Sequence, residues 1–249
     1  MRYLASCSYI LARKKRRKEK RDGNLKLAKD DYRIRIREIA EERGIVHLCH
    51  FTPAPNLNSI IEYGFLCRDH LFAARHFACT SSDHRLDSEN RAISVSISAI
   101  NHRMFEGKRA KSGREDWIVF MLCPSILWTH ECRFYSRNAA RREMLGHSGF
   151  LGGPWALNEM FSPISSPHGF TGESYRSDTG IPDCLTTYSD AEVQVLEPIS
   201  SSYVIGAWVS QLSLAEKVQL HLNQLSGPER NVLVRDFSPR LSNKFDSWG

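Results

Sequence analysis

The sequence lacks the features that mark membrane and secreted proteins. No run approaches the ~18 apolar residues that a membrane-spanning helix needs, which argues against a membrane protein. The seven cysteines are odd in number and have no tight spacing, so a disulfide-stabilised secreted scaffold is not expected. The short apolar stretch at residues 3–12 precedes basic residues, whereas in a signal peptide it follows them. We therefore expect a protein of the reducing cytoplasm that does not associate with a membrane.

Several catalytic signatures are also missing. There is no GxxxxGK[ST] phosphate loop, no GxGxxG after a strand and no GxSxG elbow, so common nucleotide-binding and serine-hydrolase motifs are excluded. Three short His and Cys pairs have spacings found in zinc sites, but no second pair completes a pattern. They are His47 with His50, Cys67 with His70, and His76 with Cys79. The prediction is that no metal is bound.

What the sequence does have is one concentrated block of positive charge. Residues 13–21 read RKKRRKEKR and carry a net charge of +7, while the whole 249-residue chain carries +6. The remainder of the chain therefore sums to −1, and the basic character is local. Such a block suits a phosphate backbone, although a solvated helix face or a flexible arm explains it equally well.

The hydrophobic pattern predicts a mixed chain. Strands are expected over residues 45–52, 92–100, 117–123, 191–196 and 203–209, and helices within 1–44, after Asn56, near 156–161 and over 214–225. We expect Asn56 to cap its helix and Gly64 to close it. Residues 101–115 are expected to form a basic loop, and the tail after Gly227 to be loose. Because helices lie mostly at the ends and strands in the middle, the fold class is α+β.

A few polar residues lie at strand edges, where chemistry is often found. His50 and Thr52 share one face of the first strand, and Asn56 follows at the start of a helix. Glu192 lies on the polar side of a strand whose other side is apolar. Taken alone, a carboxylate in such a position is more often a solvated surface group than a catalytic one.

Four stretches of the sequence form an ordered set of motifs. The first is HFTPAPNLNSIIEYGFL at residues 50–66. The second comprises RLD at 85–87, AISVSI at 92–97 and the loop with Asn101, Met104 and Phe105. The third is FYSRNAA at 134–140, and the fourth is YSDAEVQV at 188–195 with Ile205 and Gly206 beyond it. In this order they resemble the DarT family of ADP-ribosyltransferase toxins that modify nucleic-acid bases, and the matches span about residues 45–209.

The resemblance implies an NAD-dependent enzyme with a split central β-sheet and flanking helices. Its domain would cover residues 45–249, preceded by a basic helical extension over residues 1–44. Glu192 matches the family's catalytic glutamate, which would stabilise the oxocarbenium-like ribose as nicotinamide leaves. His50 and Thr52 match residues that hold the nicotinamide end of NAD, and Asn56 matches a further NAD contact. Arg85 is our choice for the functional arginine, with Arg91 as the alternative.

The acceptor implied by the resemblance is a base in single-stranded DNA or RNA, and the sequence leaves that choice open. Asn101, Arg103, Phe105, Arg137 and Tyr188 lie beside the motifs and are predicted to contact the nucleic acid by phosphate binding or base stacking. The resemblance also implies a toxin that stops growth or defends against phage, held in check by an antitoxin protein. The competing interpretations are a non-catalytic basic nucleic-acid-binding module and a transferase that modifies proteins.

Overall fold

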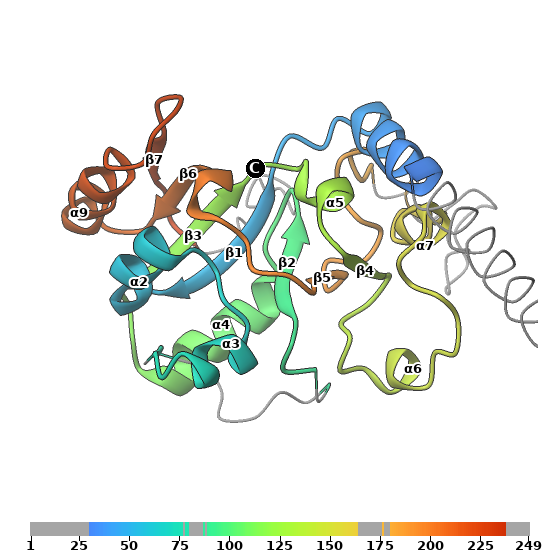
Figure 1. Cartoon of the computed structure of the whole chain (residues 1–249), viewed down its shortest axis with the longest axis horizontal. Helices are drawn as coiled ribbons and strands as arrows, with labels where there is room; N and C mark the ends of the chain where they lie inside the picture. Colours follow the sequence, from blue (N-terminus) through green and yellow to red (C-terminus); the bar gives the residue numbers. More distant parts are fainter. Residues whose placement is uncertain are drawn as a thin grey trace, which may run out of the picture.

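The structure is a computed structural model that describes residues 30–76, 78–79, 87, 89–163, 176 and 180–237. Its centre is a seven-stranded sheet in the order β4-β5-β2-β1-β3-β6-β7 (Figure 1). The strands are β1 (Leu48–Pro53), β2 (Ile93–Ile97), β3 (Trp117–Leu122), β4 (Cys132–Tyr135), β5 (Glu192–Val195), β6 (Val204–Val209) and β7 (Asn231–Val234). The helices are α2 (Leu57–Tyr63), α3 (Arg68–Ala73), α4 (His102–Ser112), α5 (Ile126–Thr129), α6 (Arg142–Leu145), α7 (Pro154–Glu159) and α9 (Leu212–Leu222), with short 3-10 turns at Ala54–Asn56 and Ser201–Tyr203. Residues 30–42 are also helical.

The sheet is divided into two halves that meet between β1 and β2. Strand β1 pairs with β3 along its whole length, from Leu48↔Leu122 to Pro53↔Trp117. Its pairing with β2 is limited to Leu48↔Ile97 and Cys49↔Ser96. The adjacent strands of the sheet are antiparallel except for β6 and β7, which run parallel. The predicted fold class, α+β with a split central sheet and flanking helices, is therefore confirmed.

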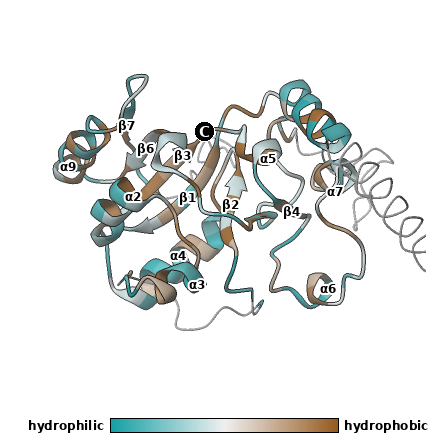
Figure 2. Ribbon diagram, in the orientation of Figure 1, coloured by the Kyte–Doolittle hydropathy of each residue, from teal (hydrophilic) through white to brown (hydrophobic). Residues whose placement is uncertain are grey.

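Helices cover the two faces of the sheet with different side chains. On one face the helix over 30–42, α2 and α9 contribute Ile36, Ile60 and Val218 to an aliphatic cluster that includes Val193 of β5. On the other face α4 contributes Phe105 to a smaller aromatic cluster. Figure 2 shows hydrophobic residues concentrated on β1 and β3, in the middle of the sheet. The interior is thus built from the strands whose sequence patterns are easiest to predict.

Of the N-terminal segment, the structure describes the residues from 30 onward. Ile36 and Ala40 are buried in the same core as the strands, so the helix over 30–42 packs on the main body. The basic block at 13–21 lies outside the described residues. No helix in the described ranges is long and apolar enough to cross a membrane.

Three local expectations were wrong. Residues 102–112, expected as a loop, form α4, because Asn101 accepts a hydrogen bond from the Met104 amide at 3.0 Å and Gly113 ends the helix in the left-handed region. Strand β4 was not expected. The tail after Gly227, expected to be loose, includes β7, which pairs with β6. In each case the segment has little or no hydrophobic periodicity, and its structure depends on pairing with a neighbouring strand or on a helix cap.

Of the two predictions for the ends of α2, the one for its C-terminal end is confirmed. Gly64 has φ of 77° and its amide donates to the Ile60 carbonyl, so it ends the helix as expected. A Cβ there would lie 2.4 Å from the Ile199 carbonyl oxygen, so the close approach also requires glycine. Asn56 does not cap the helix through its side chain, because that side chain is used elsewhere.

Candidate active site

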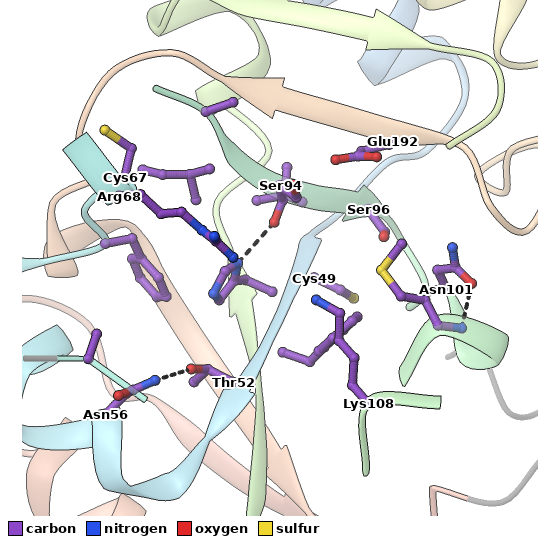
Figure 3. A pocket seen from close by; sticks show the side chains of 18 of the residues that line it. Cys49, Thr52, Asn56, Cys67, Arg68, Ser94, Ser96, Asn101, Lys108 and Glu192 are labelled. Carbon is purple, nitrogen blue, oxygen red and sulfur yellow. Dashed lines mark hydrogen bonds between the residues drawn. The ribbon is translucent and has the colours of Figure 1, made fainter. Parts of the chain in front are cut away.

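A cavity of about 400 Å³ opens where β1 and β2 separate. Because the two strands share two residue pairs and then diverge, residues from both halves of the sheet reach into it. Strand β1 contributes His50 and Thr52, and β5 contributes Glu192. Figure 3 shows Thr52 and Glu192 on their two strands. The fold therefore brings together three of the residues that the sequence singled out, although about 140 residues of chain separate the first from the last.

His50 bridges the split with its side chain. Its Nδ1 lies 2.9 Å from the Ser94 carbonyl oxygen on β2. Since a carbonyl can only accept, Nδ1 carries the proton and Nε2 is left as an acceptor. Burial lowers the pKa of His50 most, the hydrogen bond to Ser94 opposes this change and nearby Lys108 adds to it, so that the pKa is about 4. The imidazole is therefore neutral near pH 7, with its edge against the Phe65 ring.

Thr52 and Asn56 belong to a set of hydrogen bonds that holds the segment after α3. The Asn56 side-chain amide donates to the Thr52 hydroxyl at 2.8 Å and to the Cys79 carbonyl at 3.0 Å. Its oxygen accepts from the Cys79 amide at 2.8 Å. Both amide hydrogens of Asn56 are thus used within the protein. The arrangement holds residue 79 against the end of β1, where both line the cavity.

Glu192 is buried, with 8% of its surface exposed. Its Oε2 accepts from the Asn138 side-chain amide at 2.8 Å and from the Ala139 backbone amide at 3.1 Å. Asn138 is itself held by the Ala140 amide, which donates to its side-chain oxygen at 3.1 Å. Two donors on one oxygen fix the rotation of the carboxylate. The alternative interpretation, a solvated surface carboxylate, is thus wrong for Glu192.

The turn after β4 that contains Asn138 also binds a second carboxylate, two residues before Glu192. Asp190 lies 2.8 Å from Arg137 Nε and 2.5 Å from Arg141 Nε. The Arg137 guanidinium also lies 3.9 Å from the centre of the Tyr188 ring. Arg137 and Tyr188, which the sequence assigned to nucleic acid, therefore contact each other, and Arg137 also contacts Asp190 just before β5.

The cavity is electrically polarised. Asp87, Asp190 and Glu192 line it on the side of β5, whereas Arg68 and Lys108 are the cations among the described residues that line it. Figure 3 shows Arg68 entering from the α3 side and Lys108 from the α4 side. Sequence reasoning missed Arg68 and Lys108 because nothing in their neighbourhood marks them. It also missed Asn138 as a contact of Glu192, although that residue belongs to a quoted motif.

The remaining predicted site residues lie in different positions relative to the cavity. Arg85 lies outside the described residues. Arg91 is exposed and does not line the cavity. Asn101 lines the cavity but its side-chain oxygen caps α4, and Arg103 is exposed on that helix. Phe105 is fully buried against Phe51, Trp117 and Phe237, so the prediction that it stacks on a base is wrong.

Thiol and imidazole groups near the cavity do not assemble into a metal centre. Cys67 Sγ and His70 Nδ1 are 3.0 Å apart, as their spacing allows. Within the part of the chain that the structure describes, no three His, Cys, Asp or Glu side chains gather to hold an ion. The six described cysteines are free thiols.

Comparison with known structures agrees with the fold. Thermus sp. 2.9 DarT in complex with carba-NAD+ is 13% identical, with a TM-score of 0.51 over 77% of this chain and 96% of that chain. The same protein in complex with NAD+ gives 11%, 0.50, 76% and 96%. Thermosipho africanus DarTG in complex with ADP-ribose gives 13% and 0.46, and this chain spans 50% of that chain's length. Comparison with curated protein sequences gave no match.

A family model provides the assignment. The model described as "ssDNA thymidine ADP-ribosyltransferase, DarT" matches residues 49–238, which include β1 with His50, β5 with Glu192 and the turn between them that holds the carboxylate. The match ends within the C-terminal residues and begins after the N-terminal helix. The chain therefore belongs to the DarT family of single-stranded-DNA thymidine ADP-ribosyltransferases and is an NAD-dependent enzyme that transfers ADP-ribose.

Proposed function

We propose that this protein transfers a single ADP-ribose from NAD to a thymine base in single-stranded DNA, with Glu192 as the catalytic carboxylate. The observation that carries the proposal is the convergence of Glu192 and His50 on one cavity at the split of the sheet. A cavity of about 400 Å³ is also in the range of small-molecule sites.

The charge distribution of the cavity fits NAD in one orientation. NAD carries a negative pyrophosphate in its middle, and its nicotinamide ribose becomes positive as the bond to nicotinamide breaks. Arg68 and Lys108 suit the pyrophosphate. Glu192 suits the developing positive charge, because a carboxylate in a partly dry site stabilises it more strongly than water does. The reverse orientation would bring the pyrophosphate against three carboxylates.

His50 and Thr52 are then the residues that hold the nicotinamide end, and His50 does so as an acceptor. Its Nδ1 proton is committed to the Ser94 carbonyl, so Nε2 accepts from a carboxamide or a ribose hydroxyl. Asn56 contributes by keeping Thr52 and residue 79 in place. Arg85 remains our choice for the functional arginine, ahead of Arg91, since Arg91 is exposed outside the cavity.

The chemical step exchanges one C–N bond for another. The bond from ribose C1 to the nicotinamide nitrogen breaks and nicotinamide leaves as a neutral molecule. The thymine ring nitrogen N3, the one not attached to deoxyribose, forms the new bond to C1 and releases its proton to water. Because N3 belongs to the pairing edge of the base, the acceptor has to be unpaired, which explains a single-stranded substrate.

Incubation with labelled NAD and, in parallel, single-stranded DNA, single-stranded RNA and a protein mixture tests the proposal. We expect label in DNA that contains thymine, no label in polyadenine or polycytosine strands, and none with Glu192→Ala. Label in RNA or in protein alone would overturn the acceptor. Binding to DNA without any label would favour a non-catalytic module instead.

The biological role that follows is that of a toxin. A base whose pairing edge carries ADP-ribose cannot template a complementary base, so replication stops. A cell that makes such an enzyme needs a protein that restrains or reverses it, which supports the proposal of an antitoxin and of a role in growth arrest or phage defence. Expression should stop growth, and Glu192→Ala should abolish that effect. Growth arrest by the Glu192→Ala protein would contradict a catalytic origin of toxicity.

A further inference from the structure

One of the three carboxylates that line the cavity among the described residues has no role in the proposed function. Asp87, which precedes β2 in the chain, lines the cavity together with Asp190 and Glu192. Asp190 is committed to its ion pairs with Arg137 and Arg141, and Glu192 is assigned to the ribose. Asp87 is therefore the carboxylate that remains for a further step of the reaction.

Asp87 is held by a glutamine of the catalytic strand. Gln194 on β5 is fully buried, and its Nε2 donates to Asp87 Oδ2 at 2.7 Å. The backbone amide of Glu89 donates to Asp87 Oδ1 at 3.2 Å. The side-chain oxygen of Gln194 is buried and has no hydrogen-bond partner within the part of the chain that the structure describes. Burial of an unpaired carbonyl oxygen is unfavourable, so packing alone does not account for a glutamine at this position, whereas its contact with Asp87 does.

The segment that contains Asp87 is bound to two strands. Arg133 on β4 lies opposite Gln194 on β5, and its guanidinium forms an ion pair with Glu89 at 2.8 Å. Two residues that face each other across β4 and β5 thus hold the segment at Asp87 and at Glu89. A carboxylate can accept about four hydrogen bonds, so two bonds orient Asp87 and do not prevent it from taking a proton. A fixed position suits a catalytic base, because proton transfer requires a defined distance.

The separation of Asp87 from Glu192 follows from the strand that positions both. Glu192 and Gln194 are two residues apart on β5, so their side chains share one face of the strand and lie ~7 Å apart. Since Asp87 lies at the end of the Gln194 side chain, its carboxylate is about 7 Å along the strand from that of Glu192. Tyr135, opposite Glu192 on β4, lies near both carboxylates. Burial raises the pKa of Tyr135 most, Arg133 opposes this change, and the charges of Glu192 and Asp87 add to it.

The proposed reaction needs two groups at about this separation. Nicotinamide leaves as a neutral molecule and needs no acid, whereas thymine N3 carries a proton that it has to lose as it bonds to the ribose. In glycosidases that invert configuration, one carboxyl group acts at the bond that breaks. A second carboxylate, ~6.5–9.5 Å away, takes a proton from the nucleophile. The same division of tasks fits Glu192 and Asp87, with thymine in the place of the nucleophilic water.

We propose that Asp87 is the general base of the transfer and takes the N3 proton of the target thymine. As the bond from ribose C1 to nicotinamide breaks, its electron pair goes to the nicotinamide nitrogen. N3 forms the new bond to C1, and its proton moves to a carboxylate oxygen of Asp87, which then passes it to water. Gln194 is a positioning residue, since it acts through Asp87. The inference rests on the proposed function and assigns the proton-transfer step within it.

Asp87→Asn tests the proton transfer, because Asn keeps the shape and the acceptor for Gln194 and removes the charge. Full-length protein is incubated with labelled NAD and single DNA strands that contain either thymine or 5-bromouracil. The bromine is similar in size to the methyl group of thymine and makes N3 more acidic. Asp87→Asn should lower kcat on thymine ~10²- to 10⁴-fold, the usual contribution of a general base. On 5-bromouracil the loss should be at least ~10-fold smaller, and the Kd for NAD should stay within a few-fold of the unsubstituted value.

The pH profile provides a second measure of the same step. Below the pKa of thymine N3, the fraction of thymine that is already deprotonated rises about 10-fold per pH unit. The rate of Asp87→Asn should therefore rise from neutral to alkaline pH, while that of the unsubstituted enzyme changes little. Asp31→Asn, exposed on the helix over 30–42 and outside the cavity, is the matched control and should behave as the unsubstituted enzyme. An equal loss of Asp87→Asn on thymine and 5-bromouracil, with a flat pH profile, would overturn the base and indicate a structural role.

Gln194→Leu keeps the test decisive if Asp87→Asn does not fold. Leu has a similar volume and lacks the donor, so kcat on thymine should fall roughly 10-fold. The loss should again be smaller on 5-bromouracil, with the Kd for NAD unchanged, and an equal loss on both bases would contradict positioning of a base. If Asp87→Asn and Gln194→Leu are as active as Asp31→Asn, this inference alone is defeated. If the unsubstituted protein modifies neither strand, the proposed function itself fails.

Discussion

The two walls of the cavity are built by different means. The β1 wall belongs to a strand that is six residues long and paired along its whole length with β3. The β5 wall belongs to a strand of four residues that is paired along its whole length with β4, and the Glu192 carboxylate at its start is held in addition by Asn138 and Ala139 of the turn after β4. On the first wall the backbone ladder determines where His50 and Thr52 point. On the second, the ladder places Glu192, and Asn138 and Ala139 determine how its carboxylate is turned.

This difference teaches where the enzyme is sensitive to substitution. A side chain on a fully paired strand keeps its direction when a neighbour changes, because the strand's hydrogen bonds do not depend on that neighbour. A carboxylate held by a few side-chain and backbone donors loses its direction when one of them is removed. We therefore expect large catalytic effects from small changes on the β5 wall and milder, binding-type effects on the opposite side.

The largest effect is expected from Glu192→Gln, which keeps the shape and removes the charge. The kcat should fall at least ~10²- to 10³-fold, because the positive charge that develops on the ribose loses its partner. The Kd for NAD should change far less. Steady-state kinetics and calorimetry measure the two quantities. A kcat within a few-fold of the unsubstituted enzyme would assign the chemistry to another residue.

On the β1 wall, the largest effect concerns stability in acid. The folded-state pKa of His50, about 4, lies below its ordinary 6.5, so the unfolded chain binds a proton that the folded chain does not. Stability is therefore present in full above pH 6.5 and decreases as the pH falls towards 4, by ~3 kcal/mol from this group. Urea unfolding at several pH values should show this dependence reduced in His50→Gln. Parallel curves for the two proteins would contradict it.

An intermediate effect is expected from Asn138→Asp, which replaces a donor to Glu192 by a second carboxylate. The kcat should fall roughly 10- to 100-fold near pH 8, the cost of a hydrogen bond to a charged group, with the Kd for NAD little changed. Activity should recover as the pH falls, because a protonated carboxyl at this position donates again. Asn158→Asp, on the exposed surface of α7, is the matched control. A loss that does not depend on pH would indicate a structural role only.

The smallest effects are expected from the cations of the cavity. Arg68→Gln or Lys108→Gln should raise the KM for NAD about 10-fold and leave kcat nearly unchanged, since the pyrophosphate is far from the bond that breaks. Binding of ADP should weaken in the same proportion, and binding of adenosine should not change. Arg35→Gln, exposed on the helix over 30–42 and outside the cavity, provides the control. Equal losses for ADP and adenosine would contradict a phosphate contact.

Much of this architecture is encoded in local patterns. The alternation in residues 92–100 and the apolar run at 117–123 predict β2 and β3, and the family motifs predict that His50 and Glu192 share a site. Strand β4 escapes prediction because it has four residues and becomes a strand by pairing with β5. Helix α4 escapes because its charged sequence has little amphipathic period and depends on the Asn101 cap. The error at Phe105 has the same origin, since a loop residue was expected and a buried helical one is found.

Site residues that depend on distant contacts are the hardest to predict. Arg68 lies next to a buried cysteine at the start of a short helix, and no spacing connects it with Lys108, 40 residues later. Their common position depends on the divergence of β1 from β2, which no single segment specifies. The contact between Asn138 and Glu192 likewise joins residues 54 positions apart.

The short junction between the two halves of the sheet also connects ligand binding with the stability of the folded state. Two residue pairs, the His50–Ser94 contact and the adjacent His47–Ser98 contacts join β1 to β2, so the two halves are joined over a short part of their length. A molecule bound across the split contacts both halves of the sheet where β1 and β2 are not paired. By mass action, NAD at about 100 times its Kd should add ~2.7 kcal/mol to the stability of the folded state. The supply of the donor substrate thereby affects how long the enzyme persists, because a cell depleted of NAD would hold a larger unfolded fraction, which proteases degrade.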